Sequence, residues 1–185
     1  MKLRESIYVI GEGLTEKYYF QHIKKLKGYS CVVRPRFFSS KNSIYYLEKR
    51  TKELLLADVT VICAFDSDVS QRNQEERERH QKFIKSYQGN KKVIICDSLP
   101  SIEFWFLLHF RKTNKQFANY TAIRNKLRKY IPNYDKTERF LCQDKWVRVL
   151  IDKQNIAIEN GKSLNPEEGS YSNIYKAVKI LEEML

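Results

Sequence analysis

The sequence predicts an α/β fold with about four mostly parallel strands flanked by helices, followed by a packed helical C-terminal half. Two observations predict this class. Short apolar runs alternate with amphipathic helical patterns over residues 1–98, as in sheets whose parallel strands are joined by helices. From Ser98 onward the strand signals stop and helical patterns follow one another to the end of the chain.

The first strand and the first helix are expected at residues 6–10 and 15–27. The strand is an apolar run, which is typical of a strand that is covered on both faces. The helix is expected because its apolar residues recur at helical spacing on one face. These residues are Tyr19, Phe20, Ile23 and Leu26.

The same alternation continues through the next segments. Residues 30–38 are rich in β-formers, but Pro35 limits them to an edge or interrupted strand. Apolar positions from Ile44 to Leu55 predict a second helix. The remaining elements expected in this half are a third strand at 58–65, a third helix that begins at Asn73 as its N-cap, and a fourth strand at 92–96.

Four helices are expected in the second half. Residues 101–110 are apolar nearly all round, which predicts a buried helix. A basic helix follows at 121–130. Two further helices are expected at 139–160 and 172–185.

Composition indicates a protein that contacts polyanions. The 34 lysines and arginines exceed the 22 acids, and the formal charge is +12. Such an excess attracts nucleic acid, although a basic surface without a specific partner would give the same charge. The four cysteines form no Cys-x-x-Cys pair, which disfavours a zinc site and fits reduced thiols. The sequence shows no signal peptide and no apolar run of membrane-spanning length, so a cytoplasmic protein without a membrane partner is expected.

Three acids follow strands of the predicted sheet. Asp66 and Asp68 end the third strand, and alternation along an extended chain points them the same way. Glu12 follows the first strand between Gly11 and Gly13. Ligands bind beyond the carboxyl ends of parallel strands, and carboxylates at such an edge favour Mg²⁺ or Mn²⁺. Each acid could instead be a solvated turn residue.

Gly11-Glu12-Gly13 is neither a dinucleotide fingerprint nor a P-loop. The third glycine is missing, and no Gly-Lys-Ser/Thr follows. An ATPase of the P-loop type is therefore not expected.

Two further acids are candidates for the site. Glu16 lies one helical turn beyond Glu12 and is either a ligand or base, or an acid that complements the helix dipole. Glu103 lies in the apolar helix, where a buried carboxylate needs a partner or a metal. Among the histidines, we expect His109 in the core, and His22 and His80 on the surface.

Basic residues cluster after the apolar helix, near Tyr120 and Tyr130. Their mixture with aromatic side chains suits contact with a nucleic-acid backbone, although solvated helix faces carry similar charge. The candidate nucleic-acid contacts are Arg111, Lys112, Lys115, Arg124 and Arg128.

Several segments together resemble the RloB-like proteins, in the same order and over nearly the whole chain. A departure is Ser101-Ile102, where that family more often has Asn-Pro-Cys-Phe. The segments that carry the resemblance are Gly11-Glu12-Gly13-Leu14-Thr15-Glu16, Phe65-Asp66-Ser67-Asp68, residues 100–110, Tyr134-Asp135-Lys136 and Asn165-Pro166.

The resemblance implies a single domain over residues 1–185. It would comprise a Toprim-like core at 1–98 and a helical extension at 99–185 packed on that core. In the Toprim fold, an acid after the first strand and an Asp-x-Asp after the third bind Mg²⁺, roles that carry over to Glu12, Asp66 and Asp68. The family is also linked with bacterial phage defence, often beside an ATPase partner.

These observations lead to a hypothesis of Mg²⁺-dependent or Mn²⁺-dependent cleavage of DNA or RNA. Its metal ligands would be Glu12, Asp66 and Asp68, and its further catalytic residues Glu16, Glu103 and Lys136. Lys17 is an alternative to Lys136 for neutralising charge. Other interpretations stay open. The chain could instead be a binding module that regulates an ATPase, or a primase-like transferase. Use of a tyrosine nucleophile and self-association also stay open.

Overall fold

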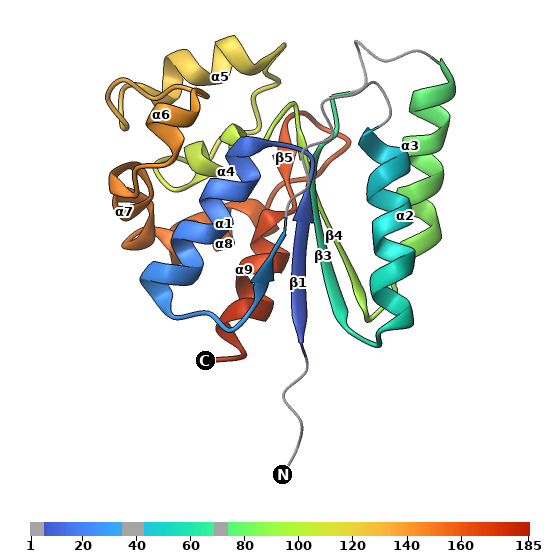
Figure 1. Ribbon diagram of the computed structural model, residues 1–185. Coiled ribbons are helices and arrows are strands. Elements are labelled where there is room, and N and C mark those ends of the chain that lie inside the picture. The colour runs from blue at the N-terminus through green and yellow to red at the C-terminus, as the bar shows by residue number, and fades with distance from the viewer. Residues whose placement is uncertain (1–5, 35–42, 69–73) are drawn as a thin grey trace.

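The computed structural model describes residues 6–34, 43–68 and 74–185 (Figure 1). The expected N-cap Asn73 and the part of the expected edge strand from residue 35 onward lie outside the described residues. The α/β class with a helical C-terminal half is confirmed.

One sheet organises the fold, with the strand order β2-β1-β3-β4-β5. The first four strands are parallel, as expected, and β5 is antiparallel to β4. The fifth strand is a two-residue addition that the sequence did not predict. The strands are β1 (Ile7–Gly11), β2 (Val32–Val33), β3 (Thr60–Asp66), β4 (Val93–Leu99) and β5 (Tyr171–Ser172).

Helices cover both faces of the sheet (Figure 1). One face carries α2 (Ser43–Leu56) and α3 (Gln74–Tyr87). The other carries α1 (Leu14–Lys27) together with the helical half. The helical half comprises α4 (Glu103–Leu108), α5 (Tyr120–Leu127), α6 (Glu138–Leu141), α7 (Lys145–Ile151), α8 (Gln154–Lys162) and α9 (Ile174–Glu182).

Alternation along β3 divides the apolar interior into two cores. Val61, Cys63 and Phe65 point toward α2 and α3. Ile62 and Ala64 join the core that includes α1 and the helical half. Because strand residues from the α/β half and residues of α4 to α9 share this second core, the helical half is packed against the sheet.

The prediction of a single helix at residues 139–160 is wrong, because three helices, α6 to α8, occupy this stretch. The first break allows Trp146 to turn inward, where its indole nitrogen donates a 3.1 Å hydrogen bond to the carbonyl of Leu141. The same carbonyl lies 2.8 Å from Nε2 of His22. A continuous helix would have used this carbonyl within its own backbone ladder.

Two histidine predictions are also wrong, since His22 and His80 are both buried. His22 points from α1 toward the α6–α7 junction, and His80 packs edge-on against the ring of Phe65, with ring centroids 5.1 Å apart. The prediction for His109 is confirmed: it is buried and bonds to the carbonyl of Trp105. The cysteines are all free.

Within the described ranges, none of the helices combines the length and the apolar character needed to cross a membrane.

Candidate active site

Acidic side chains from three chain segments gather at the carboxyl edge of the sheet. Glu12 and Glu16 come from the β1–α1 connection and the first turn of α1, and Asp66 is the last residue of β3. Glu103 is the first residue of α4. β1 and β3 are paired in register, with Gly11 opposite Ala64, so the ends of these strands lie side by side. We call Glu12, Glu16, Asp66 and Glu103 the acid cluster.

The two glycines around Glu12 leave room for the side chain of Glu16. A Cβ atom on Gly11 would lie 2.9 Å from the carbonyl oxygen of Ala64 and 3.2 Å from Cβ of Glu16. A Cβ atom on Gly13 would lie 2.8 Å from Oε2 of Glu16. Glycine at both positions therefore lets Glu16 fold back over the turn, where only 5% of the residue is exposed.

Asp66 is held by the backbone at the start of the helical half. Its Oδ1 accepts a 2.9 Å hydrogen bond from the amide of Ile102. Burial raises the pKa of Asp66 well above its usual range, and the neighbouring carboxylates of Glu16, Glu103 and Glu12 raise it further. Lys136 acts in the opposite direction but does not cancel these effects.

Glu16 titrates near neutrality. Burial raises its pKa from 4.5 to about 7, with further increases from Glu103 and Glu12, while Lys136 lowers it. Like charges that lie this close favour protonation when no cation separates them. Lys136 therefore offsets only part of the effect that burial and the neighbouring acids have on the pKa of Glu16.

Glu103 has partners within the protein for both oxygens. Its Oε2 accepts a 2.6 Å hydrogen bond from the hydroxyl of Ser101, and its Oε1 accepts one of 2.9 Å from Tyr134. The ammonium of Lys136 lies 3.2 Å from Oε2. Glu103 is wholly buried, so these three contacts stabilise a carboxylate that would otherwise be costly.

Lys136 is a cation that lies beside the acid cluster. Burial alone would lower its pKa, but Glu103, Asp66 and Glu16 together raise that pKa above its ordinary value. Its ammonium also lies 4.3 Å from the centre of the Tyr120 ring. Lys136 therefore stays charged beside the acids.

The acid cluster has the kind of donor atoms that a hard divalent cation prefers. Carboxylate oxygens are the ligands that Mg²⁺ and Mn²⁺ prefer, and an ion among Glu12, Glu16 and Asp66 would relieve their repulsion. However, no three acidic, histidine or cysteine side chains in the described ranges already form a set that could hold a metal ion. Asp68 is half-buried just beyond β3, and it is not among the strongest electrostatic influences on Asp66. The joint role of Glu12, Asp66 and Asp68 as metal ligands stays a prediction.

The predicted nucleic-acid contacts lie before α5, on it at Arg124 and directly after it at Arg128. Arg111, Lys112 and Lys115 lie in the segment that precedes α5, and all three are exposed. Arg128 is exposed but also donates a 2.9 Å hydrogen bond to the carbonyl of Tyr134. Arg111 and Lys115 line a cavity of about 170 Å³ with Thr113, Phe117, Leu107 and Lys126. Contact of these residues with nucleic acid stays a prediction.

The sequence alone did not reveal the contacts of Ser101 and Tyr134 with Glu103. It indicated that Glu103 needs a partner, but Tyr134 lies 31 positions away and looks like an ordinary turn residue in the sequence. The motif Tyr134-Asp135-Lys136 was the part of the sequence that could have indicated these partners, because its first and third residues both contact Glu103.

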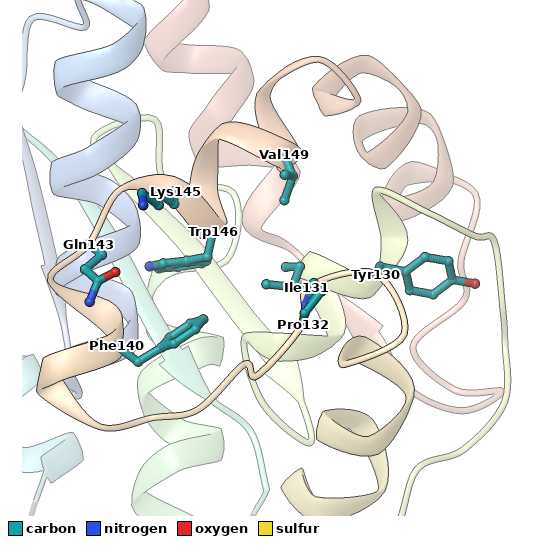
Figure 2. A pocket seen from close by; sticks show the side chains of 8 residues that line it. All are labelled: Tyr130, Ile131, Pro132, Phe140, Gln143, Lys145, Trp146 and Val149. Carbon is teal, nitrogen blue, oxygen red and sulfur yellow. The ribbon is translucent and has the colours of Figure 1, made fainter.

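An apolar pocket of about 220 Å³ lies elsewhere on the helical half (Figure 2). Its lining includes the charged residue Lys145 but no member of the acid cluster. The other residues that line it are Tyr130, Ile131, Pro132, Phe140, Gln143, Trp146 and Val149. It therefore does not contribute to the candidate active site.

A family model described as RloB-like protein matches residues 7–181. Comparisons with curated proteins and with solved structures gave no significant match. The family match covers both the sheet and the helical half, including every residue of the acid cluster and Lys136. The chain therefore belongs to the RloB-like protein family.

Proposed function

We propose that the chain is a Mg²⁺-dependent or Mn²⁺-dependent nuclease that hydrolyses phosphodiester bonds of DNA or RNA in bacterial phage defence, together with a partner protein. The observation that carries this proposal is the acid cluster itself. Two carboxylates with raised pKa values, those of Glu16 and Asp66, lie with Glu12 and Glu103 at the carboxyl edge of a mostly parallel sheet, in a protein with a formal charge of +12.

Each residue has a role in this reaction that follows from its position. Glu12 and Asp66, with Asp68, would hold the metal ion. When bound, the ion would polarise the phosphoryl oxygen and lower the pKa of the attacking water. Glu16 would accept a proton near neutral pH. Glu103 would fix Lys136, whose charge would offset the negative charge that builds up on the phosphoryl group.

The test is a cleavage assay with purified protein. Plasmid, single-stranded DNA and RNA are incubated with Mg²⁺ or Mn²⁺, and the wild type is compared with Asp66→Asn and Glu12→Gln. Asp58→Asn is the matched control, because Asp58 is an exposed acid that precedes β3 at its opposite end. The proposal requires cleavage by wild type and control that disappears in both site variants. Equal trace activity in all four proteins would indicate contamination and refute it.

A second candidate is a binding module that regulates an ATPase. Two observations favour it. No three acidic, histidine or cysteine side chains in the described ranges form a set that could hold a metal ion. Glu103 is already bound by Ser101, Tyr134 and Lys136, as in a structural ion pair. Such a module would bind nucleic acid or nucleotide without cutting it. Binding by wild type with no cleavage under any metal condition would support this candidate over the nuclease.

A further inference from the structure

Two polar atoms of α5 are buried without a hydrogen-bond partner in the described part of the chain. They are the hydroxyl of Tyr120 and Nε of Arg124. A buried donor without a partner destabilises the folded protein, and most such groups in proteins are paired. Two of them on one short helix indicate that their partner is a ligand.

The two side chains lie together beside the acid cluster. Tyr120 and Arg124 are four positions apart on α5 and so share one face of the helix. The guanidinium carbon of Arg124 lies 5.5 Å from the centre of the Tyr120 ring, and the Lys136 ammonium lies 4.3 Å from it. Lys136 in turn contacts Glu103. Tyr120, Arg124 and Lys136 therefore form one group, which we call the donor wall.

The chemistry of the donor wall selects an anion. Arg and Lys can only donate hydrogen bonds. Burial raises the pKa of Tyr120, and Glu103 raises it further, so this hydroxyl also keeps its proton and donates. A phosphate matches this arrangement, because its oxygens would accept hydrogen bonds from the donor wall and would coordinate a metal ion held by the carboxylates.

We propose that Tyr120 and Arg124, together with Lys136, bind a phosphate group of the nucleic acid at the candidate active site. This inference rests on the proposed function for the choice of nucleic acid as the source of the phosphate. It assigns Tyr120 as a hydrogen-bond donor and not as a covalent nucleophile. It also gives α5 a defined role, which is to present two donors to the ligand.

The test measures binding without cleavage. A short fluorescent single-stranded oligonucleotide is titrated with protein in Ca²⁺ and, separately, in EDTA, for wild type, Tyr120→Phe and Arg124→Gln. The matched controls are Tyr45→Phe and Arg79→Gln. Arg79 lies over the Tyr45 ring at 5.6 Å on the opposite face of the sheet, so the controls make the same chemical changes away from the site.

We expect Arg124→Gln and Tyr120→Phe each to weaken binding about tenfold or more, as for the loss of one hydrogen bond to a charged group. The controls should change binding less than about twofold. Arg79→Gln measures how much of any effect comes from the loss of one positive charge away from the site. Competition with inorganic phosphate and with a nucleoside triphosphate identifies the source of the phosphate. Release by the triphosphate at far lower concentration than by an unlabelled oligonucleotide would overturn the assignment to nucleic acid.

Thermal unfolding of the same proteins separates a ligand contact from a structural role. Since the Tyr120 hydroxyl has no hydrogen-bond partner among the described residues, Tyr120→Phe should leave the unfolding temperature unchanged or raise it. A lowered temperature with unchanged binding would make Tyr120 structural and overturn the inference. So would site variants that bind like their controls, or a wild type that binds no phosphate-bearing probe. If the site variants lose binding while no protein cleaves, the donor wall stands and the nuclease proposal fails.

Discussion

The ammonium of Lys136 lies 3.2 Å from the buried carboxylate of Glu103. Lys136 belongs to the segment between α5 and α6, whereas Glu103 begins α4 directly after the last parallel strand. This ion pair joins the α5–α6 segment to the start of α4, where α4 follows the carboxyl end of β4. It also places a permanent cation beside Asp66 and Glu16, which both feel its charge.

Lys136→Met should destabilise the protein, because it leaves Glu103 buried without its cation. Removing one partner of a wholly buried pair costs about 3–5 kcal/mol, and we expect about 1–3 kcal/mol here because Lys136 is partly exposed. Urea unfolding measures the change. Lys92→Met, which breaks the exposed pair with Asp58, should cost less than about 1 kcal/mol. Equal effects of the two substitutions would show that the Glu103 pair is not buried as described.

Tyr134→Phe should also lower stability. The substitution removes the 2.9 Å hydrogen bond to Oε1 of Glu103, and a hydrogen bond to a charged group is worth about 1.5–3 kcal/mol. Tyr120→Phe deletes a hydroxyl that has no hydrogen-bond partner in the described ranges, and it should cost nothing. Denaturant unfolding of the two variants side by side checks the contrast. A larger loss for Tyr120→Phe would reverse the roles assigned to the two tyrosines.

The two glycines around Glu12 should respond differently to alanine. A methyl group on Gly11 meets the backbone carbonyl of Ala64, which cannot move without disturbing the sheet, so Gly11→Ala should cost about 1–3 kcal/mol. A methyl group on Gly13 meets only the end of the Glu16 side chain, which can rotate away. Gly13→Ala should therefore keep most of the stability while moving Glu16. Thermal unfolding of both variants tests this order, and a more severe loss for Gly13→Ala would contradict it.

Stability should fall as the pH rises when no divalent cation is present. The folded-state pKa of Glu16 is about 7 and its ordinary value is 4.5, so between these values the folded protein binds more protons than the unfolded chain. The contribution of protonated Glu16 is complete below about pH 4.5 and is lost as the pH rises through about 7. Glu16→Gln stays neutral and should remove this part of the pH dependence.

Unfolding temperatures from about pH 4 to about pH 9, for wild type and Glu16→Gln, measure that difference. Added Mg²⁺ should stabilise the wild type more at about pH 8 than at about pH 5, because metal ligands must be deprotonated. Identical pH profiles for the two proteins would show that Glu16 is not buried among like charges.

The sequence predicted the sheet better than the helical half for a physical reason. Buried parallel strands are continuous apolar runs, and β1, β3 and β4 all lie where such runs were found. The β5 strand has only two residues, and it pairs with the end of β4, where Ser172 lies opposite Ser98 from 74 positions along the chain. The break between α6 and α7 likewise depends on burial of Trp146, which helical periodicity does not reveal.

In the candidate site, too, local pattern predicted some residues, whereas contacts between distant segments could not be predicted. Glu12 and Asp66 could be placed at one edge of the sheet because strand ends follow from local pattern and topology. The partners of Glu103 could not, because Tyr134 and Lys136 reach it from a segment more than thirty positions away. Burial of His22 was missed because its partner, the Leu141 carbonyl, lies 119 positions along the chain.

Binding of a divalent cation by Glu12 and Asp66 at the edge of the sheet is tested most directly by a crystal that is soaked in Mn²⁺ and examined for anomalous scattering. We predict a peak in contact with carboxylate oxygens of both residues, absent from crystals of Asp66→Asn. A difference map without such a peak, with Glu12 and Asp66 pointing apart or joined only through Lys136, would contradict this prediction.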